Sequence, residues 1–289
     1  MREQIKVQGP YNFKQALKRL TVDPLALTNV EEQTLRIPLL IDEKQAVVDV
    51  TQTGSFEEPV FEIVTDSKVD QDKLFKRLNE IFHWDIPLET IYQYFQDTEL
   101  DQLFSQFRGT PFVCDFQLYG CLMKTIIHQQ LNMSFAFVLS NRFKQNFGTE
   151  IDGVWFYPSP DKVSRLDPED LIALQFSRRK AEYVIDTSRL ITDGLLDLDS
   201  LKSLDDEEVI SRLIAIRGIG RWTAENFLMF GLGRLDLFPV ADIGIQNGMK
   251  KYYKLDKKPS KEVMIDKSEA WKPYRTYASL YLWESLESD

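Results

Sequence analysis

Two glycines that flank a single isoleucine, Gly218 and Gly220, constrain the fold of this chain more than any other short segment. An apolar helical pattern runs into them from Leu213, and a second helical pattern begins directly after them at Arg221. Because glycine has no Cβ, the backbone there can turn sharply and approach another molecule closely. The unpaired N–H groups and the dipole at the start of the second helix favour an anion such as phosphate. The segment therefore predicts either a phosphate-binding helical hairpin or an ordinary helix corner with a glycine cap.

The composition is that of a globular chain long enough for two domains. Of its 289 residues, 43% are hydrophobic and 28% are charged, and chains beyond about 250 residues usually divide into domains. The two cysteines, Cys114 and Cys121, lie in apolar segments, which indicates a reducing compartment rather than a disulfide framework. The first residues lack an apolar signal core, and no apolar run reaches the length of a membrane span. We therefore expect a cytoplasmic protein that does not associate with membranes.

Charge is distributed unevenly along the chain. The net charge of −10 and the pI near 4.9 disfavour a nucleic-acid binder that relies on overall electrostatic attraction. Between Val209 and Lys261, however, ten lysines and arginines accompany only four acidic residues. Because the local charge decides where a polyanion docks, this segment is a candidate for DNA contact. An ordinary solvated basic surface is the alternative.

Hydrophobic periodicity predicts an α+β fold. The segments 34–41, 45–51 and 59–65 alternate or are rich in β-branched residues, and turn-forming residues separate them. Together with one short amphipathic helix over 11–20, they predict a small antiparallel sheet domain over residues 1–95. Helical periodicity begins near Val69 and dominates the rest of the chain. We therefore predict a mainly α-helical second domain over residues 96–289, which contains the glycine hairpin at about 209–231.

Few residues are candidates for chemistry at a defined site. The two histidines, His83 and His128, are distant in sequence, and Cys-x-x-Cys and His-Glu-x-x-His motifs are missing, which argues against a zinc site. Phosphate-loop and nucleophile-elbow motifs are missing as well. Asp242 is the exception, because an apolar segment leads to it and a helical segment follows it. It is either a helix N-cap or a rigidly held carboxylate that faces a cleft, and the two roles are compatible.

Two motifs connect these features to a known family. The first is Ile-Arg-Gly-Ile-Gly-Arg-Trp-Thr-Ala at 216–224, and the second, Phe-Pro-Val-Ala-Asp, ends at Asp242. In this order and spacing they resemble the helix-hairpin-helix DNA glycosylase superfamily and, within it, the DNA-3-methyladenine glycosylase II type. The resemblance also includes the small N-terminal sheet domain. It covers nearly the whole chain, with further family counterparts at 126–130, 157–160, 166–168, 179–181 and 271–278.

The resemblance implies a monofunctional glycosylase that excises alkylated purines of the 3-methyladenine and 7-methylguanine type in base excision repair. Asp242 would stabilise the oxocarbenium-like sugar and orient or deprotonate the attacking water. Relatives that also cleave the strand carry lysine directly before the Thr-Ala of the hairpin, where this chain has Trp222. The implied partner is double-stranded DNA with damaged bases, bound by a monomer. The alternatives are a glycosylase for oxidised bases, which the missing lysine disfavours, and a non-catalytic helix-hairpin-helix DNA-binding protein.

The resemblance further implies a stacking pocket for the flipped base and a wedge that fills the gap in the duplex. The turn formed by Gln129, Gln130 and Leu131 corresponds to the loop that enters the duplex, and the choice of wedge among the three stays open. Core packing is an equal alternative for every aromatic pocket candidate outside the hairpin. The pocket candidates are Trp222, Trp271 and Tyr274, with Tyr277 as a further possibility.

At the hairpin itself, the backbone amides of Gly218 and Gly220 would bind phosphate. Arg221 and Thr223 would add side-chain contacts to the DNA backbone. In the family, carbonyl groups of this hairpin also hold a monovalent cation. We expect no other cofactor and no other metal site.

Overall fold

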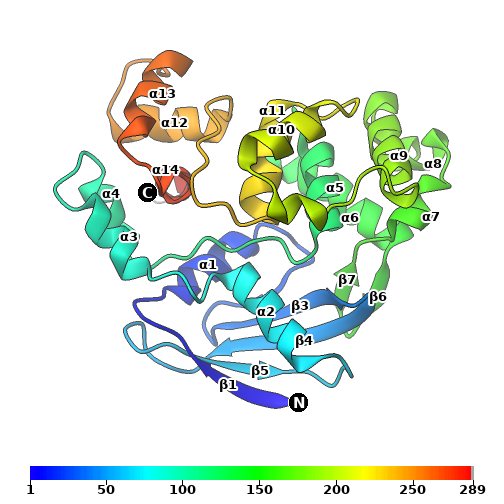
Figure 1. Cartoon of the computed structure of the whole chain (residues 1–289), viewed down its shortest axis with the longest axis horizontal. Coiled ribbons are helices and arrows are strands. Elements are labelled where there is room, and N and C mark those ends of the chain that lie inside the picture. Colours follow the sequence, from blue (N-terminus) through cyan, green and yellow to red (C-terminus); the bar gives the residue numbers. More distant parts are fainter. Residues whose placement is uncertain (288–289) are drawn as a thin grey trace.

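A five-stranded antiparallel sheet forms the N-terminal part of the computed structural model, which describes residues 1–287 (Figure 1). Its strands follow the order β1-β5-β4-β3-β2. Alternate side chains of the third strand, from Leu35 to Ile41, are buried while their neighbours are more exposed, as in a sheet with one face on the core. The predicted antiparallel sheet is confirmed, with a short further strand at each edge. The strands are β1 (Arg2–Lys6), β2 (Leu27–Asn29), β3 (Thr34–Ile41), β4 (Lys44–Gln52) and β5 (Val60–Val64).

Helices α1 (Phe13–Leu20) and α2 (Gln71–Phe82) lie between this sheet and the helical part of the chain (Figure 1). The ring of Phe13 meets that of Phe61 edge-on, with 5.2 Å between the ring centroids, and this contact fixes α1 on the sheet. Gln15 and Arg19 lie on the same helix and hydrogen-bond to a residue of the C-terminal helix. Helix α1 is therefore in contact with both parts of the chain.

The rest of the described chain is mostly helical, as predicted. A two-stranded hairpin, β6 (Thr149–Ile151) and β7 (Val154–Phe156), interrupts the helices and was not predicted. The helices are α3 (Leu88–Phe95), α4 (Asp101–Gln106), α5 (Leu118–His128), α6 (Met133–Phe147), α7 (Pro160–Ser164), α8 (Pro168–Ile172), α9 (Arg178–Thr192), the 3₁₀ turn η1 (Ser200–Ser203), α10 (Asp206–Ile214), α11 (Arg221–Asn226) with its π-helical continuation η2 (Phe227–Gly231), α12 (Ile243–Tyr252), α13 (Lys261–Glu269) and α14 (Arg275–Glu287).

Buried side chains of the sheet and of the helical part form one contiguous hydrophobic cluster. The two predicted domains therefore share a core, and the boundary at residue 95 stays a prediction. Within residues 1–287, each helix is too short or too polar to cross a membrane. In Figure 1 the sheet lies at one end of the molecule, and the helices of the glycine hairpin, α10 and α11, lie at the opposite end.

Candidate active site at the glycine hairpin

The two glycines of the hairpin have different structural roles. Gly218 has a φ of +91°, and a Cβ at this position would lie 2.2 Å from the ring of Tyr183, so only glycine fits. Gly220 has a φ of −101° and is the N-cap of α11. A Cβ at Gly220 would meet no described atom within 4 Å. The fold requires glycine at 218, whereas Gly220 leaves the start of α11 open to another molecule.

Gln129 and Thr223 brace the hairpin from inside. The side-chain amide of Gln129 donates hydrogen bonds to the carbonyl of Gly218 (2.9 Å) and to the hydroxyl of Thr223 (2.8 Å). The side chain of Thr223 is buried, with 1% of the residue exposed. Both side chains thus have partners within the protein, and their contact with DNA stays a prediction.

Two carbonyl groups of the hairpin are candidates for holding the monovalent cation that the resemblance implies. The carbonyl oxygen of Ile216 accepts a hydrogen bond from the backbone N–H of Ile219 at 3.1 Å. The carbonyl oxygen of Gly218 accepts a hydrogen bond from the side-chain amide of Gln129. A carbonyl oxygen has two lone pairs, so each oxygen can still coordinate an ion. The cation itself stays a prediction.

Of the three residues in the turn after α5, Gln130 is the most outward. Gln130 is exposed and adopts the left-handed conformation with a φ of +57°, whereas Leu131 packs partly against the core. The turn is held by Lys180 of α9, whose ammonium donates to the carbonyls of Ile127 (2.7 Å) and Gln129 (2.9 Å). Lys180 therefore satisfies carbonyl groups at the end of α5. From the sequence, Lys180 was noted only as part of the segment 179–181, which has a family counterpart, and no role was predicted for it.

The partly buried ammonium of Lys180 should make stability depend on pH. Burial lowers its pKa from 10.5 to about 8. Between these pH values the unfolded chain binds more protons at Lys180 than the folded chain does, so this residue's contribution to stability rises with pH. Below pH 8 the burial penalty is fully present. Urea titrations of the wild type and of Lys180→Met measure the difference between their free energies of unfolding. We expect this difference, wild type minus variant, to grow as the pH is raised from about 8 to 10.5. A constant difference would contradict the lowered pKa of Lys180 in the folded protein.

Asp242 is held by three N–H donors. It is the N-cap of α12, and its Oδ1 accepts the backbone N–H of Ile245 at 2.9 Å and the indole N–H of Trp283 at 3.0 Å. Its Oδ2 accepts the indole N–H of Trp222 at 2.9 Å. Within the described residues Oδ2 accepts this bond alone, so one of its two lone pairs stays available. The carboxylate is half-buried, which means that it is fixed in orientation yet reachable from outside. The predicted N-cap is confirmed, and the role as a carboxylate that faces a cleft stays a prediction.

Sequence reasoning missed Trp283 and the glycines that admit it. A Cβ at Gly244 would lie 2.8 Å from the indole nitrogen of Trp283 and 3.0 Å from Oδ1 of Asp242. One turn later, a Cβ at Gly248 would lie 2.6 Å from the carbonyl oxygen of Leu282. The bare backbone of α12 therefore lets α14 approach closely. The spacing of Gly244 and Gly248, which places them on one helix face, was a signal for this contact.

The aromatic residues near the carboxylate agree only in part with those predicted. Trp271 is 1% exposed and packs edge-on against Phe238, with 5.0 Å between ring centroids, so it belongs to the core and not to a pocket. Tyr277 is also fully buried. Tyr274 is half-buried and lies edge-on to Tyr94 at 5.3 Å; its contact with a base stays a prediction. Of the predicted pocket residues, Trp222 is the one that reaches Asp242.

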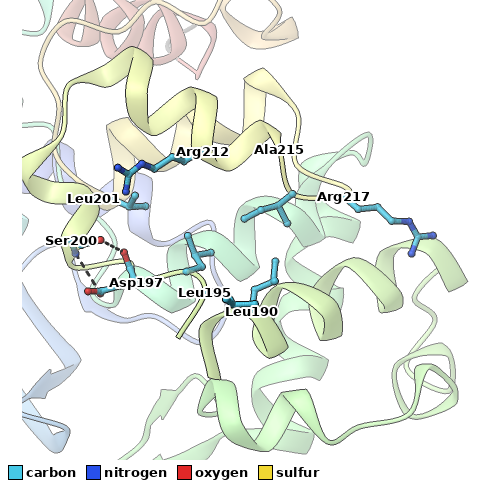
Figure 2. Close-up of a pocket in the computed structure, with 10 residues that line it drawn as sticks. Leu190, Leu195, Asp197, Ser200, Leu201, Arg212, Ala215 and Arg217 are labelled. Atoms are coloured by element: carbon cyan, nitrogen blue, oxygen red, sulfur yellow. Dashed lines mark hydrogen bonds between the residues drawn. The ribbon is translucent and has the colours of Figure 1, made fainter. Parts of the chain in front are cut away.

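A cavity of about 480 Å³ lies elsewhere, between the end of α9 and α10 (Figure 2). Leucines dominate its apolar lining, and Arg212 and Arg217 lie at its edge. Its described lining residues include neither Asp242 nor the two indoles that hold this carboxylate. We therefore do not assign this cavity to a base.

Ion pairs within the protein offset the basic character of the hairpin. The guanidinium of Arg221 lies 2.7 Å from a carboxylate oxygen of Glu207 and 2.9 Å from one of Glu225. Arg217 pairs in the same way with Glu182 at 2.7 Å. Acidic residues outside the Val209–Lys261 segment therefore pair with its arginines. For Arg221 to contact DNA, a phosphate would have to replace a carboxylate as its ion-pair partner. That contact stays a prediction.

Comparison with known proteins shows what this arrangement is similar to. Residues 123–273 match the family model of the HhH-GPD superfamily of base excision DNA repair proteins. The chain is 47% identical over 287 residues, 99% of each chain, to YfjP of Bacillus subtilis (strain 168), which carries the provisional name DNA-3-methyladenine glycosylase. The 3-methyladenine DNA-glycosylase from Archaeoglobus fulgidus shares the fold, with a TM-score of 0.83 and 22% identity over 97% of both chains. The Schizosaccharomyces pombe 3-methyladenine DNA glycosylase Mag1, in complex with abasic DNA, has a TM-score of 0.61 and 30% identity over 68% of this chain and 96% of that chain.

Proposed function

The chain belongs to the HhH-GPD superfamily of base excision DNA repair proteins, and we propose that Asp242 carries the hydrolysis by which it excises alkylated purines from duplex DNA. The names of its relatives support alkylated bases as the substrate class and DNA as the partner. The single observation that supports the assignment of Asp242 is its geometry: three N–H donors fix the carboxylate, and one lone pair of Oδ2 stays available.

This geometry suits cleavage of the bond between C1′ of the sugar and the purine nitrogen. An alkylated purine such as 3-methyladenine or 7-methylguanine is already cationic, so it takes the bonding electron pair and leaves as a neutral base without a general acid. Positive charge then develops on the sugar, and the anionic oxygen of Asp242 stabilises it. Water adds to C1′, and its proton passes to Asp242 or to solvent. The carboxylate needs no reorientation during the step, because its hydrogen bonds already hold it.

The hairpin and the turn after α5 are proposed to bind the DNA. The exposed start of α11 at Gly220 offers backbone amides to a phosphate. Gln130, at the exposed tip of its turn, is proposed as the wedge that enters the duplex. The rings of Trp222 and Trp283 are proposed to flank the extruded base. We further propose that the protein acts as a monomer.

The wild-type protein should release 3-methyladenine and 7-methylguanine from alkylated duplex DNA and leave the strand uncut. The indole of Trp222 occupies the place of the lyase lysine and donates to Asp242, so it cannot form a Schiff base with the sugar. Chromatography of the released bases identifies the substrate, and denaturing gels with and without alkali separate base release from nicking.

Three outcomes of that assay would argue against this function. Enzyme–DNA adducts trapped with borohydride would show lyase chemistry. Release of oxidised purines alone would favour the oxidised-base alternative. DNA binding without release of any base would favour a non-catalytic helix-hairpin-helix protein.

A further inference from the structure

A carboxylate of the C-terminal helix depends on donors from the N-terminal part of the chain. Glu284 of α14 has a fully buried side chain, with 0% exposed. Its Oε1 lies 3.0 Å from Nη1 of Arg19 on α1, and its Oε2 accepts the side-chain amide of Gln15, also on α1. A buried carboxylate is tolerated only when charged or polar groups compensate it. Helix α1 therefore supplies compensation that the helical part of the chain needs.

The same arginine contacts the neighbour of Glu284. The guanidinium carbon of Arg19 lies 5.8 Å from the ring centroid of Trp283, within the range of a cation–π contact. The ring of Phe230 stacks against Trp283 as well, with 5.9 Å between centroids. The indole N–H of Trp283 in turn donates to Oδ1 of Asp242. A chain of direct contacts thus runs from α1 through Trp283 to the proposed catalytic carboxylate.

We propose that Arg19 is a positioning residue for the glycosylase reaction: fixed by Glu284, it holds the indole of Trp283 and thereby the orientation of Asp242. This inference rests on the proposed function of Asp242. It makes helix α1, and with it the N-terminal sheet part, a support of the active site. A displacement of about 1 Å at a reacting group can reduce a rate by up to about 100-fold, so loss of this support should reduce the rate of the chemical step.

The test needs a variant that does not remove Arg19 while the charge of Glu284 remains. Arg19→Met alone takes the ion pair with Arg19 from a buried carboxylate and would destabilise the fold. The double variant Arg19→Met/Glu284→Gln removes both charges together. Arg19→Lys serves as the conservative variant, because lysine keeps the cation near Glu284 and Trp283.

A matched control removes another ion pair between the same two parts of the chain. Lys144 of α6 lies 2.8 Å from a carboxylate oxygen of Asp23, which follows α1. Among residues 1–287, these two side chains pair with each other and Lys144 lies over the ring of Tyr157, with no hydrogen bond or ion pair to Trp283 or Asp242. Asp23→Asn/Lys144→Met therefore weakens the contact between the two parts in a comparable way without touching the proposed chain of contacts.

Three quantities are measured for each variant: the single-turnover rate of base release at saturating enzyme, the Kd for the same DNA, and the hydrogen-exchange rate of each tryptophan indole N–H by NMR. In Arg19→Met/Glu284→Gln we expect the rate to fall about tenfold while the Kd changes by less than about twofold. We expect the indole N–H of Trp283 to exchange faster, and that of Trp271, in the core, to stay unchanged. Arg19→Lys should keep the rate within about threefold of the wild type.

The control distinguishes a specific effect of Arg19 on Trp283 and Asp242 from a general weakening of the contact between the N-terminal and helical parts of the chain. An equal loss of rate in Asp23→Asn/Lys144→Met would overturn the proposal, and so would unchanged exchange at Trp283 in the Arg19→Met/Glu284→Gln variant. If the wild type releases no base, the proposed function fails. The exchange rate of Trp283 still shows in that case whether Arg19 holds the indole.

Discussion

Asp242→Asn is expected to lower the single-turnover rate of base release by about 10²- to 10⁴-fold. The substitution removes the negative charge that stabilises the cationic sugar and the base that accepts a proton from water. It also turns an amide N–H toward the indole N–H of Trp222, so the hydrogen bond to Oδ2 is lost. Release of 3-methyladenine from alkylated duplex DNA, followed at saturating enzyme, measures the effect.

Folding and DNA binding of this variant should stay close to those of the wild type. Asparagine caps a helix about as well as aspartate, so the bond to the N–H of Ile245 is kept. Asp205→Asn is the matched control, because Asp205 caps α10 in the same way, accepting the N–H of Glu208 at 2.8 Å. Its rate should equal that of the wild type. An Asp242→Asn enzyme as fast as the wild type would refute the proposed role of this carboxylate.

Gly218→Ala is expected to lower the free energy of unfolding by about 2–4 kcal/mol and to weaken DNA binding as well. Alanine is strained at a φ of +91°, and its Cβ would overlap the ring of Tyr183, to which it would lie 2.2 Å away. The ring or the hairpin must therefore move, and the backbone amides that are proposed to bind phosphate move with the hairpin. Urea denaturation measures the stability, and titration with duplex DNA measures the affinity.

Gly220→Ala is the control for this substitution within the same hairpin. A Cβ at Gly220 meets no described atom within 4 Å and the φ of −101° suits alanine, so we expect a change in stability of less than about 1 kcal/mol, from the poorer N-cap. Its DNA affinity should fall nevertheless, because the added methyl group lies where a phosphate would approach. If Gly218→Ala were no more destabilising than Gly220→Ala, the steric account of Gly218 would be wrong.

The parts of the fold that were predicted are those with a strong local pattern. The sheet was recognised from strands such as β3 and β4, whose alternate side chains are buried. The edge strands β1 and β2 were missed because most of their side chains are exposed, so they carry no such alternation. The hairpin of β6 and β7 was missed because each strand has only three residues.

Two site residues show what the sequence could not predict. Gln129 was predicted to contact DNA because its turn resembles the family's loop that enters the duplex, but the hydrogen-bond partners of its side chain, Gly218 and Thr223, are 89 and 94 residues away in sequence. Trp271 was a candidate for the base pocket with core packing as an equal alternative, and it packs in the core against Phe238. Exposure of a single side chain depends on what the rest of the chain places beside it.

The sequence by itself determined the residues from which the proposed chemistry is built. The glycines at 218 and 220, a carboxylate that caps a helix at 242, and an indole in place of a lysine at 222 are all properties of short segments, because turns, caps and missing amines need no distant partner. Only the tertiary structure decided what holds that carboxylate. Trp283 lies 41 residues from Asp242, and Arg19 reaches the neighbouring Glu284 from 265 residues away. Such contacts form only when the chain folds around its hydrophobic core and brings α1, α12 and α14 together.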